Sequence, residues 1–173
     1  MLLLVASAFA SPSFAALAGG GVISGTADDR REYSSMSPML AATVDWRFAW
    51  VEAWLGVSAT GFVAPDGDGV VPAALLQGEV GLGLGNPVSS AGIFFGSGLS
   101  GGEGGVYGRL MFPGPGWAPR LGGELRAFHL GETNSSGMVF LLRAELGGIR
   151  RPASPPPPPP PPPPVHHDDP YGA

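Results

Sequence analysis

Ten charged residues lie inside segments where apolar and polar residues alternate, and each falls on the less apolar side of its own segment. A period of two indicates β-strands, because successive side chains of a strand project to opposite faces. Five of the ten are acidic and five are arginines, so the set carries no net charge. A fold for this chain must therefore gather all ten on one face of a sheet. The ten are Asp45, Arg47, Glu52, Glu79, Arg109, Arg120, Glu124, Arg126, Arg143 and Glu145.

The alternation predicts an all-β domain of eight antiparallel strands. The clearest two strands are joined by a tight reversal at 49–51, and the first strand alternates least. The predicted ranges are 19–27, 39–48, 52–62, 73–85, 90–100, 105–112, 119–130 and 138–148.

Strand length and connection length favour a membrane-spanning barrel over a soluble sheet. Most predicted strands are about 9–12 residues long, near what a tilted strand needs to cross a bilayer and longer than is usual in soluble proteins. Short turns alternate with longer loops, apart from the short connection 101–104, and this alternation is typical of outer-membrane barrels. The turns are at 49–51, 86–89 and 113–118, and the loops are at 28–37, 64–72 and 131–137.

An eight-stranded barrel has an interior just wide enough for side chains to fill. A sheet in lipid must also close, because unpaired N–H and C=O groups at an open edge are costly there. The charged face would then line the lumen, where acids and arginines can pair, and Gly56, Gly81 and Gly83 would make room for the long arginines. The predicted lumen charge network is Asp45, Arg47, Glu52, Glu79, Arg109, Glu124, Arg126, Arg143 and Glu145.

Four tryptophans gather near two of the short turns. Trp46, Trp50 and Trp54 flank the turn 49–51, and Trp117 lies in the turn 113–118. Tryptophan favours the bilayer interface, where its ring is buried and its N–H remains hydrated. We therefore predict an interfacial aromatic girdle at the periplasmic rim, which places the longer loops outside the cell.

This pattern resembles the small eight-stranded outer-membrane β-barrels, the class of the OmpA transmembrane domain, OmpX and OmpW. The resemblance covers about residues 19–151 and is one of pattern, without a signature motif. The chain departs from the class at its last strand, which ends LGGIRR without a terminal aromatic residue. It implies an up-and-down transmembrane β-barrel in the outer membrane of a Gram-negative bacterium. The implied partners are the lipid bilayer and lipopolysaccharide.

The two ends of the chain have compositions of their own. Residues 2–10 are apolar and are followed by two small-x-small sites, so we predict a signal peptide over 1–18, cleaved after Ala15 or Ala18. The barrel would occupy 19–151. Residues 152–173 contain ten consecutive prolines and would form a disordered periplasmic tail with a polyproline rod of roughly 30 Å. That tail is either a spacer or ligand for the cell wall or a proline-binding partner, or a low-complexity end without a role.

Composition and motifs argue against several functions. The net charge of −5 argues against nucleic acid as a partner, and the absence of cysteine excludes thiol ligands and disulfides. The histidines and aspartates at 166–169 lack the spacing of a metal site, so we expect no metal and no cofactor.

The function expected is structural, adhesive or envelope-interacting, with a charge-filled, non-conducting lumen and no catalysis. One alternative is a secreted soluble β-barrel or sandwich that binds a small apolar ligand, because periodicity alone fits that fold too. A weaker alternative is a lipid-modifying barrel enzyme centred on His129, near Ser135, Ser136 and Glu132.

Overall fold

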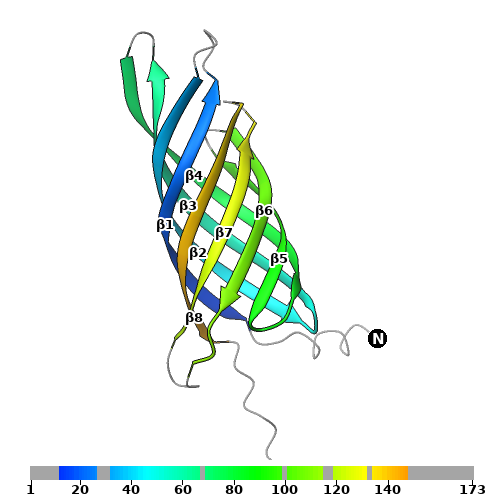
Figure 1. Cartoon of the computed structure of the whole chain (residues 1–173). Coiled ribbons are helices and arrows are strands. Elements are labelled where there is room, and N and C mark those ends of the chain that lie inside the picture. Colours follow the sequence, from blue (N-terminus) through cyan, green and yellow to red (C-terminus); the bar gives the residue numbers. More distant parts are fainter. Residues whose placement is uncertain are drawn as a thin grey trace, which may run out of the picture.

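The chain folds into a closed eight-stranded antiparallel barrel (Figure 1), as the alternation predicted. The computed structural model describes residues 12–26, 32–66, 69–98, 101–114, 119–131 and 134–147, without side chains for 64–66 and 69–70, and contains no helix in these ranges. Each strand pairs with the next along the chain, and β8 closes the barrel on β1. The strands are β1 (Ser13–Thr26), β2 (Glu32–Phe48), β3 (Val51–Asp66), β4 (Gly69–Gly85), β5 (Ser89–Gly98), β6 (Gly101–Met111), β7 (Arg120–Leu130) and β8 (Ser135–Gly147).

The register fixes the stagger of the barrel. Following paired residues once around the wall from Ser13 leads back to Ile23, ten residues further along β1 (23 − 13). Ten residues correspond to about 33 Å of stagger over a circumference of about 38 Å, which tilts the strands by about 40°. The residues on this path are Ser13, Asp45, Trp54, Gly81, Phe94, Gly105, Phe128, Gly137 and Ile23.

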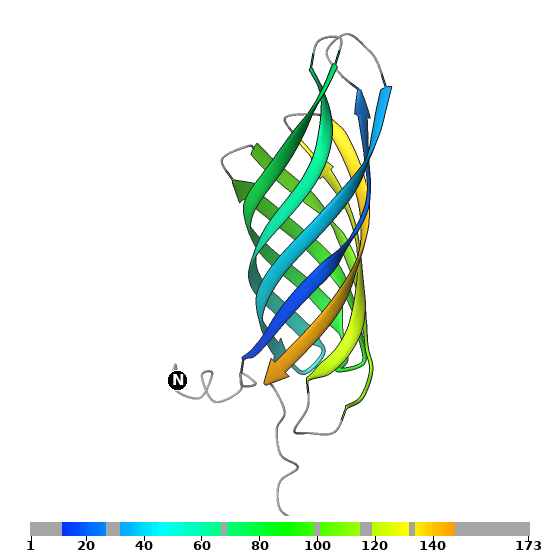
Figure 2. The same cartoon turned by 90° about the vertical axis from the view of Figure 1, so that its left-hand side faces the viewer.

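β1 begins and β8 ends at the same end of the barrel, which is the lower end in Figures 1 and 2. The turn at Ala49 and Trp50, the turn 86–88, the end of β6 and the start of β7 also lie at this lower end. Ala49 adopts a positive φ of 51°, the left-handed conformation that a two-residue hairpin turn requires.

The predicted start of the first strand was wrong. β1 begins at Ser13 instead of residue 19, and Ser13–Ala18 pair with both β2 and β8. β1 as a whole is rich in alanine and glycine, so little alternation reveals it. Its glycines serve close packing: a Cβ at Gly21 would lie 1.8 Å from the carbonyl oxygen of Met138 on β8.

Three predicted connections are largely strand. β2 begins at Glu32, inside the expected loop 28–37, and β6 begins at Gly101, inside the expected connection 101–104. The expected loop 64–72 is reduced to two residues between Asp66 and Gly69. The prolines that indicated a loop are tolerated because of where they lie. Pro72 pairs with Val63 on β3, but the ladder between β4 and β5 starts only at Gln77, so its missing N–H faces an unpaired edge.

The β3–β4 hairpin therefore extends beyond the rest of the wall. β3 pairs with β2 only as far as Thr60, whereas it pairs with β4 as far as Asp66. The β1–β2 hairpin also continues, to the pair of Thr26 with Glu32. Figures 1 and 2 show these hairpins rising above the shorter strands β5, β6, β7 and β8.

Small residues opposite large rings allow the interior to close. Trp54 on β3 is directly opposite Gly81 on β4, and a Cβ at Gly81 would lie 2.1 Å from the indole ring. The hydroxyl of Tyr107 occupies the corresponding space over Gly83. The inner glycines Gly81 and Gly83 thus make room for aromatic rings, and the expectation that they accommodate arginines was wrong.

We predict that Gly81→Ala destabilises the barrel by about 1–3 kcal/mol, because the new methyl group overlaps the Trp54 ring. Gly78→Ala on the same strand is the control, since its Cβ would meet only the Ser97 carbonyl, at 3.9 Å. Urea titration of the refolded barrel in detergent measures the difference. Equal midpoints for the two variants would contradict the packing of Trp54 on Gly81.

Candidate functional site in the barrel interior

The interior charges form one network near the lower end of the barrel. The structure places all nine residues of the predicted lumen network on the inner face, together with Arg120. All except Arg47 and Arg120, at the lower rim, are buried. Parity therefore located these side chains on the inner face, and the register determines which of them meet.

Glu124 on β7 is the centre of the network. Its carboxylate accepts hydrogen bonds from Arg109 Nε at 2.7 Å, Arg126 Nε at 2.7 Å and Arg143 Nη1 at 3.3 Å. These arginines come from β6, β7 and β8. One fully buried carboxylate thus holds three guanidinium groups, which by themselves would repel one another.

Asp45 and Glu52 supply negative charge from β2 and β3. Arg109 Nη1 donates to Asp45 Oδ1 at 3.1 Å and to Glu52 Oε1 at 2.5 Å, and Arg143 also pairs with Asp45. Tyr107 donates its hydroxyl hydrogen to Glu52 at 3.1 Å. The ion pairs therefore cross the lumen from β6 and β8 to β2 and β3, so charge pairing ties opposite walls together.

Two arginines complete the network at the lower rim. Arg47 Nη2 lies 2.5 Å from Glu52, and Arg120 Nη2 lies 2.5 Å from Glu145. Their side chains keep 18% and 17% of their surface exposed, whereas their acidic partners are buried. Each arginine thus covers a buried acid from the solvent side.

An aromatic layer covers the network from above. Arg126 lies 5.1 Å from the ring centroid of Trp54 and 5.2 Å from that of Phe94, and its Nη1 donates to Glu79 at 2.7 Å. Trp54 meets Tyr107 edge-on at 5.8 Å. A guanidinium over a ring face in a desolvated site is attracted by the ring quadrupole, so this layer joins the charged and apolar parts of the interior.

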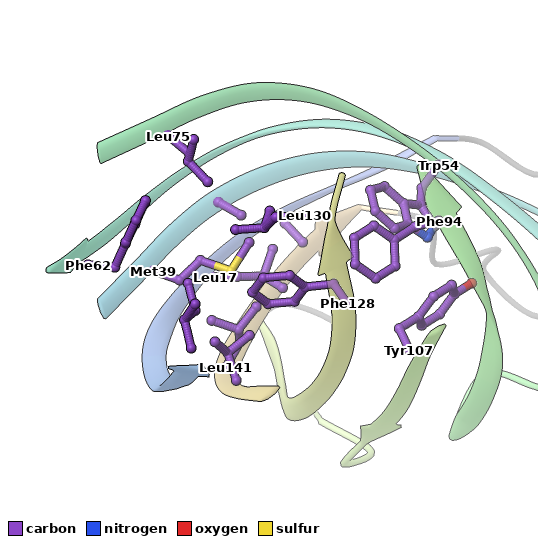
Figure 3. Close-up of a cluster of buried hydrophobic side chains, with 14 residues drawn as sticks. Leu17, Met39, Trp54, Phe62, Leu75, Phe94, Tyr107, Phe128, Leu130 and Leu141 are labelled. Carbon is purple, nitrogen blue, oxygen red and sulfur yellow. The ribbon is translucent and has the colours of Figure 1, made fainter. Parts of the chain in front are cut away.

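The upper interior is mainly apolar. Figure 3 shows Leu17, Met39, Leu75, Phe128 and Leu130 grouped apart from the Trp54, Phe94 and Tyr107 rings, and all of them belong to one buried cluster. The cluster draws residues from all eight strands. Buried apolar side chains from the whole wall therefore meet inside the barrel at this level.

Sequence reasoning missed one acidic residue of the interior. Glu103 lies in the expected connection 101–104, but it is buried on β6, beside the Gln77 amide, which can donate to both of its carboxylate oxygens at 3.2 Å. It shares the parity of Tyr107 and Arg109, so extending the alternation of β6 towards its start would have found it.

The predicted aromatic girdle is divided. Trp50 in the lower turn is 64% exposed and Trp46 is half-buried on the outer face. Assigning Trp54 to the girdle was wrong, because it faces the interior and is 1% exposed. Its parity already placed it with Glu52, and the glycine opposite provides its space. Trp117 lies outside the described residues.

The residues considered for catalysis fall on two faces of the wall. His129 faces outward, and its Nδ1 lies 3.2 Å from Ser136 Oγ. Ser135 faces inward and is hydrogen-bonded to the Tyr33 hydroxyl at 2.5 Å. Glu132 lies outside the described residues, as do the histidines and aspartates at 166–169. Within the described ranges, no group of three or more acidic, histidine or cysteine side chains could hold a metal ion.

A shallow groove of about 470 Å³ lies on the barrel wall near its lower end. Its floor is formed by glycines such as Gly108 and Gly123, and its walls by Leu110, Leu125 and Phe140. These leucine and phenylalanine side chains face outward, and the buried, inward-facing Ser90 and Arg109 also line the groove. The groove therefore offers a mainly apolar surface.

We predict that Arg126→Leu destabilises the folded barrel by about 3–5 kcal/mol, because it leaves Glu79 and part of Glu124 buried without a cation. Arg47→Leu is the matched control at the rim and should cost about 1 kcal/mol, since Glu52 retains Arg109 and Tyr107. Adding Glu79→Leu to Arg126→Leu should restore part of the loss. Urea titration in detergent measures all three variants. An equal loss in the free energy of unfolding for Arg126→Leu and Arg47→Leu would contradict a network centred on Glu124.

Comparisons with known proteins provide no relative for this chain. No family model, no curated protein and no solved structure matches it. No helix among the described residues is long and apolar enough to cross a membrane. Function must therefore be argued from the two faces of the barrel wall.

Proposed function

We propose that this chain is an outer-membrane β-barrel protein of structural, adhesive or envelope-interacting type, with a plugged lumen that does not conduct. The observation that carries the proposal is the inverted distribution of polarity. Among strand residues with described side chains, Glu32 at the upper start of β2 is the only aspartate, glutamate or arginine that faces outward. The charges are inside and the apolar side chains outside, as lipid around the barrel requires.

Every strand contributes large apolar side chains to the outer face. The examples below are 47–66% exposed, which in water would form a continuous apolar surface far larger than soluble monomers show. A bilayer removes this cost. One example from each strand in order is Phe14, Leu40, Val57, Leu82, Phe95, Leu110, Leu125 and Leu142.

The height of the apolar face fits the outer membrane. On β8 the apolar outward residues run from Met138 to Leu146. Eight residue steps of about 3.3 Å, tilted by about 40°, rise about 20 Å, and the flanking side chains bring this close to the 25 Å or so of an outer-membrane barrel. Above them Ser136 begins a polar row, because His129, Ser136, Ser24 and Ser34 are partners in register and all face outward.

The projecting hairpins support a role in contact outside the cell. Among the described residues, 69–76 of β4 pair with none on the β5 side, so the backbone N–H and C=O groups that point away from β3 are available to another strand. Because the interior of the barrel is filled, its surface loops and hairpins are the parts that can bind other molecules. The lower end, with both ends of the barrel domain and the short turns, would face the periplasm, and the polyproline tail would extend there.

The soluble alternative is disfavoured by both faces. A soluble carrier of a small apolar ligand needs a cavity inside the barrel, whereas here aromatic rings, aliphatic side chains and ion pairs occupy the interior. The groove near the lower end is lined by outward-facing apolar residues instead.

The proposal is tested by locating the protein. After expression in a Gram-negative host, it should sediment with outer membranes, require detergent for extraction and change its gel mobility when boiled. Reconstituted in a planar bilayer, it should give no steady conductance. Recovery of folded protein from the periplasm without detergent would refute the membrane assignment, and a stable open channel would refute the plugged lumen.

We further predict that the β3–β4 extension is dispensable for the barrel. Replacing residues 63–72 by Asn-Gly would close the hairpin at the pair of Phe62 with Ala73, and Asn-Gly suits a two-residue turn. Residues 61–74 form strand pairs only with each other, and the replacement also removes the hydrogen bond from Val63 N–H to Ser35 Oγ. Heat-modifiable barrel should therefore form with an unfolding midpoint close to that of the parent. A variant that fails to refold would show that the extension belongs to the barrel core.

A further inference from the structure

We propose that the export leader ends at Ala10, so that Ser11 is the first residue of the protein in the membrane. This inference rests on the proposed function, since only an exported barrel has a leader to lose. The observation behind it is that β1 begins at Ser13. The sites that sequence alone favoured, after Ala15 and Ala18, both lie within this strand.

Residues 13–18 form two ladders at once. On one side Ser13 pairs with Asp45 and Ala18 with Leu40 of β2. On the other side Ser13 pairs with Gly147 and Ala18 with Leu142 of β8. These six residues close the barrel between its second and its last strand, so a cut after Ala18 would remove the lower part of the closing strand.

A gap at this place would open onto the charged network. Ser13 lies beside Asp45, Ala15 lies between Thr43 and Glu145, and Leu17 is paired with Arg143. Ser13, Ala15 and Leu17 are all buried. Without these three residues, the buried acids and Arg143 would be exposed directly to lipid at this level.

The cut would also leave backbone groups without hydrogen-bond partners. The lower part of β8, from Leu142 to Gly147, would lose its β1 partner and become a sheet edge within the apolar belt. Unpaired N–H and C=O groups are strongly disfavoured in hydrocarbon, which is why membrane barrels close completely. A cut after Ala15 would produce the same defect over half the length.

The sequence offers an earlier site with the required chemistry. Ala8-Phe9-Ala10 is a small-x-small site directly after residues 2–7, which are apolar apart from Ser7, and leader-processing proteases accept small side chains at these two positions. Hydrolysis adds one water across the Ala10–Ser11 peptide bond, leaving a carboxyl group on Ala10 and an amino group on Ser11. Two residues, Ser11 and Pro12, would then precede the strand.

The first experiment measures the N-terminus of the exported protein. The full chain is expressed in a Gram-negative host, heat-modifiable protein is extracted from outer membranes, and its intact mass and N-terminal sequence are determined. The expected sequence is Ser-Pro-Ser-Phe. An N-terminus at Ala16 or Gly19, or a retained leader, in folded outer-membrane protein would overturn the inference while leaving the membrane assignment intact.

A matched pair of variants locates the cut independently of folding. Ala10→Leu should block processing and leave the leader attached, because the protease needs a small side chain there. Ala18→Leu is the same change at an outward-facing position of β1, and it should be processed normally. Blocked processing of Ala18→Leu with normal processing of Ala10→Leu would place the cut at Ala18.

Refolding decides the question if the host does not export the chain. Chains that begin at Ser11 and at Gly19 are refolded from urea into detergent, and the heat-shifted band is quantified. The chain from Ser11 should refold at least tenfold more completely. Equal yields would overturn the inference whatever the host does, whereas a chain from Ser11 that refolds but is never found in outer membranes would count against the proposed function alone.

Discussion

The pairing of buried charges across the lumen is the interaction on which the rest of this barrel depends. Glu124 pairs with Arg109, Arg126 and Arg143. Asp45 and Glu52 contribute further negative charge from β2 and β3, where both pair with Arg109. A charge left without a partner in such a site is strongly destabilising, whereas a complete network is tolerated. The register of all eight strands is therefore constrained, because a slip of one residue would turn every charge on that strand towards the apolar outer face.

The interior of the barrel is asymmetric along its axis. Ion pairs fill the lower part, and Leu75, Phe128 and Leu130 help to fill the upper part. Between them Arg126 lies against the rings of Trp54 and Phe94 while its nitrogens reach Glu79 and Glu124. One side chain thus satisfies both environments, which explains how a charged layer can directly adjoin an apolar one without a water-filled boundary between them.

Parity in the sequence was sufficient to predict the eight strands and the common face of the charged set, whereas the closed barrel was predicted from strand lengths, connection lengths and the cost of an open sheet edge in lipid. Strand limits were not accessible in the same way, because they depend on pairing partners. Pro72 indicates a loop to any local rule, yet it lies on an edge where no N–H is needed. Trp54 was misassigned because the preference of tryptophan for interfaces was given more weight than its parity. The space that admits it is created by Gly81 on the next strand, and a contact between strands cannot be read from either strand alone.

The residues of the outer face show where its apolar belt ends, just as the residues of the inner face show how the strands are registered. The polar row of His129, Ser136, Ser24 and Ser34 follows the register across four strands and rises along the barrel axis with the stagger, and the Trp46 and Trp50 side chains lie on or beyond the outer face near the lower turn. Beyond the upper row, β1, β2, β3 and β4 continue as hairpins while β5 ends at Gly98. The apolar belt is thus bounded above and below. The strands that extend beyond its upper boundary are those whose backbone edges are unpaired. In lipid such edges are excluded, so a strand can leave its neighbours only where water begins.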